Sequence, residues 1–122
     1  QEIGDARVVQ TISLATPFAG IPRAGWLGLA ATRDLDHQSP LLRRLRLRGE
    51  SSTIPHLSII AGADSLVKSP VAHALPGGEV VIMHDRGHNT LLFDDEVARV
   101  IEGRVLARRA RAATGAPPLA AE

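Results

Sequence analysis

Three short runs rich in apolar and β-branched residues most constrain what this 122-residue chain can fold into. They lie at residues 7–16, 56–61 and 80–83. A proline or glycine lies within two residues of each run, and the stretches between the runs have the composition of helices and loops. Strands that alternate with such stretches form a parallel sheet. We therefore predict an α/β fold with about three parallel strands and flanking helices.

The composition favours strands that helices bury on both faces. Hydrophobic residues make up 44% of the chain and aromatic residues only 2%, so Leu, Val, Ile and Ala must build the core. The length suffices for one domain with one core. We expect residues 1–111 to form this domain, and the tail 112–122, which has too little apolar surface to pack, to be disordered.

Two stretches predict helices beside the sheet. Ser39 is a favoured N-cap and Pro40 a favoured first residue, and Gly49 would end the helix that they begin. A second helix starts at the acidic residues 94–96 and has arginines near its end. The charges of this second helix match the helix dipole at both ends.

Charge and cysteine content exclude several classes of function. The net charge is +1 at pH 7, and arginine is concentrated at residues 43–48 and 104–111. Arginines on the polar face of a helix usually meet water, and no aromatic residues interleave them, so we expect no nucleic-acid partner. No apolar run approaches the roughly 20 residues that span a bilayer, so we expect no transmembrane segment. There is no cysteine, and His37, His56, His73 and His84 show no His-x-x-x-His spacing among themselves, so we expect no metal and no other cofactor, and the compartment stays open.

Two polar turns after the second and third runs contain the residues most suited to chemistry. Asp64 lies in the turn 62–67, and His88 lies in the turn 86–89. The carboxyl ends of neighbouring parallel strands meet at one edge of a sheet, where open α/β sheets place their sites. An acid followed by a histidine in this setting is typical of the last two members of a hydrolase triad. We predict that Asp64 and His88 are the catalytic acid and base.

Both residues also have structural interpretations. Asp64 would cap its own turn, which Asp often does, and His88 would be an ordinary loop residue. Asp85, which follows His84 at the end of the third run, is a second candidate for the functional acid.

A nucleophile for such a triad is missing from the sequence. There is no Gly-x-Ser-x-Gly motif and no cysteine, and no serine lies in the strand-turn-helix context that exposes a nucleophile. We therefore expect the chain to be the C-terminal half of a hydrolase domain whose N-terminal half is missing. Removal of the nucleophile from a triad costs on the order of 10⁶ in turnover, so we expect this chain alone to be inactive.

The motifs resemble the α/β-hydrolase fold, and within it the lipase-like serine esterases, which include bacterial triacylglycerol lipases and GPI inositol-deacylase-like proteins. The resemblance covers about residues 7–106, and four segments contain it: 8–20, 36–45, 62–67 and 87–92. Phe18 stands where the family often has His after its Thr-Pro turn.

The resemblance implies a serine hydrolase that acts on an acyl ester or another lipid. It makes His88 the general base and then acid, and Asp64 the carboxylate that orients it. It places the nucleophile and the oxyanion-hole loop in the upstream half of the same domain. Trp26 and Leu27 would bind the substrate in an acyl pocket, although a lone Trp is more often plain packing. The alternative function is a non-catalytic α/β-hydrolase-like binding or assembly module.

Overall fold

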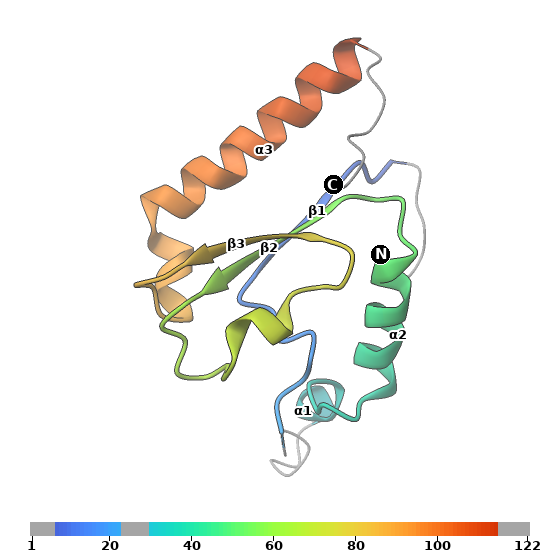
Figure 1. Ribbon diagram of the computed structural model, residues 1–122, viewed down its shortest axis with the longest axis vertical. Helices are drawn as coiled ribbons and strands as arrows, with labels where there is room; N and C mark the ends of the chain where they lie inside the picture. The colour runs from blue at the N-terminus through green and yellow to red at the C-terminus, as the bar shows by residue number, and fades with distance from the viewer. Residues whose placement is uncertain (1–6, 23–29, 115–122) are drawn as a thin grey trace.

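The computed structural model describes residues 7–22 and 30–114, and its centre is a three-stranded parallel sheet (Figure 1). The strands are β1 (Thr11–Leu14), β2 (His56–Ala61) and β3 (Glu79–Met83), and they lie side by side in the order β1-β2-β3. The predicted α/β class with three parallel strands and flanking helices is therefore confirmed.

β2 is the central strand and sets the register of the sheet. Leu57 of β2 pairs with Ile12 on one side and with Glu79 on the other. All six residues of β2 are buried, as expected of a strand that has a neighbour on each side and packing on each face. Its bounds match the predicted run.

β1 is shorter than the predicted run at residues 7–16. It begins at Thr11 and ends at Leu14, and the next residue, Ala15, has a φ of 45°. A φ in this left-handed region turns the chain out of the ladder before Pro17 is reached. The prediction of a strand over 7–16 is therefore wrong at both ends.

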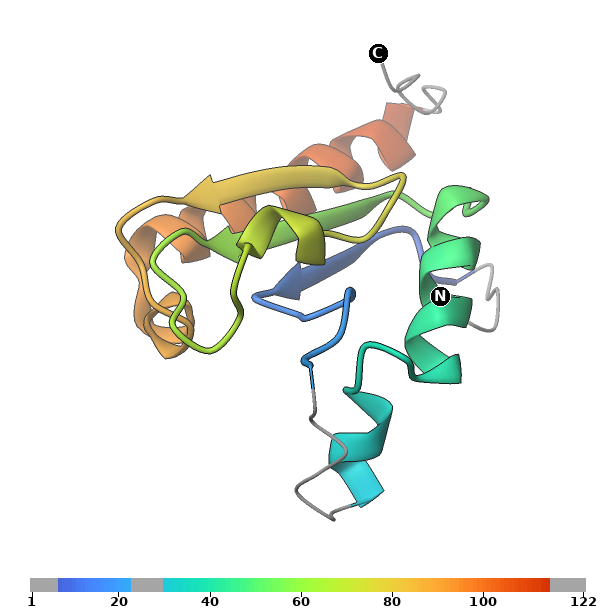
Figure 2. The same cartoon turned by 60° about the horizontal axis from the view of Figure 1, so that its bottom comes forward.

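One face of the sheet packs against the long helix α3 (Asp95–Thr114), and the short helix η2 (Pro70–His73) lies on the other face (Figure 2). Between the sheet and α3 lies the main hydrophobic core. Its largest fully buried side chains are Ile59, Leu91 and Val97. No helix within the described residues is both long and apolar enough to cross a membrane.

The predicted helix after Ser39 is α2 (Pro40–Glu50), which follows the short helix α1 (Ala30–Asp34). The Ser39 hydroxyl accepts a hydrogen bond from the Leu41 N–H at 3.2 Å, so Ser39 is the N-cap, as predicted. Gly49 does not end α2. It is buried, and a Cβ there would lie 2.8 Å from the Pro76 carbonyl oxygen, so Gly49 permits close packing.

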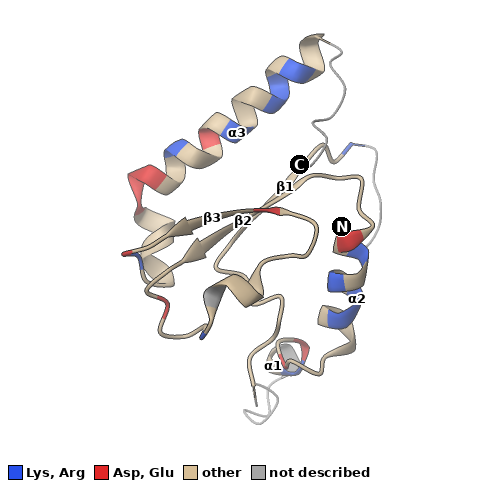
Figure 3. Ribbon diagram, viewed as in Figure 1, with Lys and Arg blue, Asp and Glu red and all other residues tan. Residues whose placement is uncertain are grey.

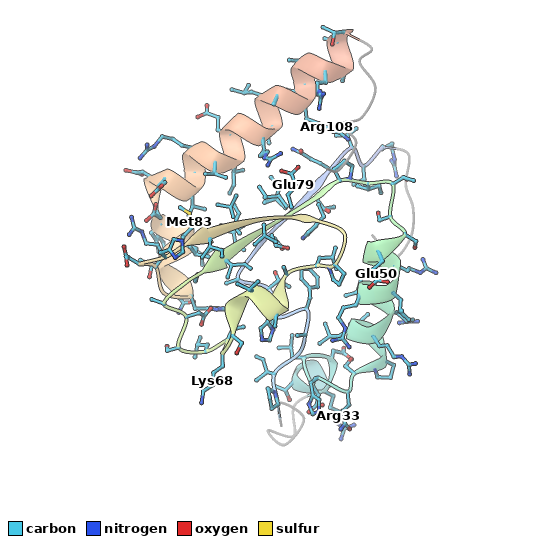
Figure 4. The ribbon with its side chains drawn as sticks, viewed as in Figure 1. Arg33, Glu50, Lys68, Glu79, Met83 and Arg108 are labelled. Atoms are coloured by element: carbon cyan, nitrogen blue, oxygen red, sulfur yellow. The ribbon has the colours of Figure 1, made fainter. Side chains whose placement is uncertain are left out.

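α3 continues to Thr114, so the prediction of a disordered tail is wrong for residues 112–114. Two arginines of α3 contact the sheet and the segment before β1. Arg104 donates two hydrogen bonds to the Glu79 carboxylate of β3, and Arg108 Nε donates to the Val9 carbonyl at 3.2 Å (Figure 4). The arginines of α2 and α3 are drawn in Figure 3. Arg104 and Arg108 therefore hold α3 against the sheet and are not only solvated surface residues.

Candidate functional site

Asp64 and His88 lie in contact beyond the ends of β2 and β3. They are 24 residues apart in the chain, and Nδ1 of His88 is 2.7 Å from Oδ2 of Asp64. The two polar turns that the sequence analysis singled out thus meet at one edge of the sheet.

The Asp64 side chain is almost fully buried, with 1% of its surface exposed. Its Oδ1 accepts the backbone N–H groups of Leu66 at 2.8 Å and Val67 at 2.9 Å. Burial raises the pKa of Asp64, but the hydrogen bonds from Val67, His88 and Leu66 together outweigh it and hold this pKa below its ordinary value. The carboxylate is therefore ionised at neutral pH.

His88 donates to this carboxylate through Nδ1, because an ionised carboxylate only accepts hydrogen bonds. In the neutral imidazole Nε2 is then the basic nitrogen, and it makes no hydrogen bond with any residue that the structure describes. The side chain is 30% exposed. The nitrogen that a triad histidine uses to take a proton is thus available.

Backbone hydrogen bonds hold the two turns together. The Gly62 N–H donates to the Met83 carbonyl at 2.8 Å, and the Ala63 N–H donates to the Arg86 carbonyl at 3.0 Å. A Cβ at Gly62 would lie 2.6 Å from the His84 carbonyl oxygen. Glycine at this position therefore permits the close approach that places Asp64 beside His88.

The short helix η3 (Asn89–Phe93) begins directly after His88 and anchors its turn in the core. Leu91 is 1% exposed and packs in the same core cluster as Val97. The next two side chains point away from the core, since Leu92 is 68% exposed and Phe93 is 85% exposed.

The structure does not assemble the other candidates from the sequence. His84 and Asp85 are both exposed, and no hydrogen bond joins their side chains. Trp26 and Leu27 lie outside the described residues. None of the serines in the described ranges hydrogen-bonds to His88, and Ser58, for example, instead accepts the Leu75 N–H at 3.1 Å.

A second polar cluster, which the sequence analysis missed, lies between β1 and the start of β2. His56 Nδ1 is 2.7 Å from the Thr11 hydroxyl, and His56 Nε2 is 3.0 Å from the Ser13 hydroxyl. Burial lowers the pKa of His56. Thr11 pairs with His56 across β1 and β2, and this pairing would have revealed the cluster. It can be recognised only once the strand register is known. With both ring nitrogens occupied, His56 is a buried cross-strand link.

In the part of the chain that the structure describes, no three His, Asp or Glu side chains are grouped so as to hold a metal ion. Comparisons of the sequence with protein-family models, with curated proteins and with solved structures gave no match. The resemblance to α/β hydrolases therefore rests on the motifs.

Proposed function

We propose that this chain supplies the acid and the histidine of a Ser-Asp-His triad in a serine hydrolase that cleaves carboxylic esters. The observation that supports the proposal most is the 2.7 Å contact between Asp64 Oδ2 and His88 Nδ1, with His88 Nε2 available. In this role the carboxylate fixes the Nδ1–H tautomer and stabilises the imidazolium. Nε2 takes the proton of the serine hydroxyl as the serine attacks the ester carbon, and returns it to the leaving alcohol.

The nucleophile in this proposal lies outside the chain, in an upstream half of the same α/β-hydrolase domain. β1 is an edge strand, and within the described residues no strand pairs with its outer side. Thr11 and Ala15 donate their N–H groups toward β2, so the backbone groups of Ile12 between them face outward. A parallel strand added here would end at the same edge of the sheet as Asp64 and His88, which is where a serine must lie.

Exposed apolar side chains near the pair favour an acyl ester or another lipid as the substrate. Leu66 follows Asp64 by two residues and is 59% exposed, and Leu92 and Phe93 follow His88 closely in η3. Large apolar side chains exposed beside polar groups are typical of surfaces that bind apolar ligands or partners.

A p-nitrophenyl ester assay on the longest natural form of the protein tests the proposal. We expect His88→Ala to lower turnover by a factor on the order of 10⁶ and Asp64→Asn by on the order of 10⁴. The matched control is Asp85→Asn, because Asp85 is an exposed neighbouring carboxylate without a side-chain hydrogen bond, and this variant should keep full activity.

A non-catalytic binding or assembly module is the second candidate function. The position of β1 at the edge of the described sheet favours it, since an edge strand is a template for strand addition by a partner. A full-length protein that is folded and inactive toward esters would support this candidate and contradict the hydrolase.

A further inference from the structure

The loop that contains His88 is closed at its base by an ion pair between Arg86 and Asp94. Arg86 Nε donates to Asp94 Oδ2, and Arg86 Nη2 lies 3.8 Å from Glu96 Oε2. The Asp94 side chain is only 11% exposed. The hydrogen bond from Arg86 holds the pKa of Asp94 below its ordinary value, so this carboxylate is charged at neutral pH.

Arg86 also contacts the turn of the acid, through its main chain. Its carbonyl accepts the Ala63 N–H at 3.0 Å, and its own N–H donates to the Met83 carbonyl at 3.2 Å. Gly62 donates to the same Met83 carbonyl. One residue is therefore joined to the Asp64 turn by its backbone and to the start of α3 by its side chain.

Asp94 uses its two carboxylate oxygens for different contacts. Oδ1 accepts the N–H groups of Glu96 at 2.8 Å and Val97 at 3.3 Å, which makes Asp94 the N-cap of α3. Oδ2 binds Arg86. Since α3 packs on the sheet through Val97, this end of the loop is fixed to the core.

We infer that Arg86, through its ion pair with Asp94, is the positioning residue that holds His88 at bonding distance from Asp64. His88 lies between two side-chain anchors, Arg86 and the buried Leu91, and a backbone hydrogen bond from the Thr90 N–H to the Gly87 carbonyl at 3.2 Å closes the turn around it. Catalytic geometry tolerates only fractions of an ångström, so loss of one anchor should release the imidazole. A role for Arg86 in catalysis rests on the proposed function. Its effect on the position of the His88 imidazole does not.

The imidazole tautomer of His88 measures this effect directly. Ring nitrogen chemical shifts of the full chain distinguish the Nδ1–H and Nε2–H forms of the neutral imidazole. We expect wild-type His88 to be Nδ1–H. In Arg86→Gln the ratio of Nδ1–H to Nε2–H should fall on the order of tenfold, the low end of what a hydrogen bond to a charged group contributes. Arg86→Lys, which keeps the positive charge, should restore part of the wild-type ratio of Nδ1–H to Nε2–H.

Two controls separate positioning from general destabilisation. His73 Nε2 lies 3.0 Å from the Lys68 carbonyl and must donate to it, so His73 reports the Nε2–H form in the same spectrum and should not change. Arg104→Gln removes the comparable pair with Glu79, away from the His88 loop, and should leave the His88 tautomer as in the wild type.

If Arg86→Gln does not fold, Asp94→Asn tests the same ion pair from its other side. Asn is as good an N-cap as Asp, so this variant keeps the start of α3 and removes only the charge that Arg86 binds. An Nδ1–H to Nε2–H ratio of His88 that stays at its wild-type value in folded Arg86→Gln or in Asp94→Asn would overturn the inference. The tautomer is independent of ester cleavage, so an inactive full-length protein would contradict the proposed function without affecting this result.

Discussion

The Asp64 carboxylate binds His88 through Oδ2 while its Oδ1 accepts two N–H groups of its own turn. The two interpretations of Asp64 from the sequence, a turn cap and an orienting acid, are therefore both consistent with the structure. The same turn contacts that hold the carboxylate in place also help to keep it ionised. A rigid, charged and buried acid is what a triad requires of this residue.

Asp64→Asn should lower stability in a pH-dependent way. The pKa of Asp64 is lowered in the fold, so its contribution to stability is present above the unfolded pKa of ~3.9 and is lost as the pH falls through the folded pKa. Asn keeps a turn-capping oxygen and loses the charge, so we expect a loss of about 1–2 kcal/mol at pH 7. Urea unfolding of the variant and of the wild type at about pH 7 and pH 3 measures this loss of stability. An equal difference between variant and wild type at both pH values would contradict the assignment.

His56→Gln should make stability less sensitive to mild acid. Burial lowers the pKa of His56, so between the folded pKa and the unfolded value of ~6.5 only the unfolded chain binds the proton. Stability is therefore present above ~6.5 and falls as the pH drops below it. Thermal unfolding across this range should show a smaller slope in His56→Gln.

If His56→Gln retains the wild-type slope, a group other than His56 is responsible for the acid sensitivity of the fold.

Gly62→Ala should destabilise the edge of the sheet that holds the pair. The new Cβ would lie 2.6 Å from the His84 carbonyl oxygen and 2.7 Å from the His84 Cα, so the backbone must shift, at a cost of about 1–3 kcal/mol. Gly103→Ala is the opposite case, since Gly103 lies inside α3 with nothing within 4 Å of an added Cβ. That variant should gain about 0.5–1 kcal/mol. Denaturant midpoints compare the two, and a Gly62→Ala protein as stable as the wild type would argue against the tight approach.

Local sequence patterns predicted the central parts of the fold because local chemistry sets them. β2 lies between Pro55 and Gly62 and is mostly apolar, and α2 begins at a Ser-Pro pair that forms a cap. The meeting of the Asp64 and His88 turns followed from the parallel order of the strands.

Long-range contacts account for part of what the sequence did not predict. β1 ends early because of the backbone conformation of Ala15, whereas the contacts of Arg104 with Glu79 and of Arg108 with Val9 join segments far apart in the chain. The link between His56 and the β1 hydroxyls depends on strand register. None of these partners is near in sequence, so residue patterns alone carry no signal for them.

The proposed function requires His88 to activate a serine that lies outside this chain. Reaction of the longest natural form with an alkyl fluorophosphonate, which loses fluoride as the serine oxygen bonds to phosphorus, followed by mass mapping of the modified residue, tests it most directly. We predict modification of one serine beyond these 122 residues, slowed on the order of 10⁴-fold or more in His88→Ala. Modification that is absent, or that proceeds at the same rate without His88, would contradict the account.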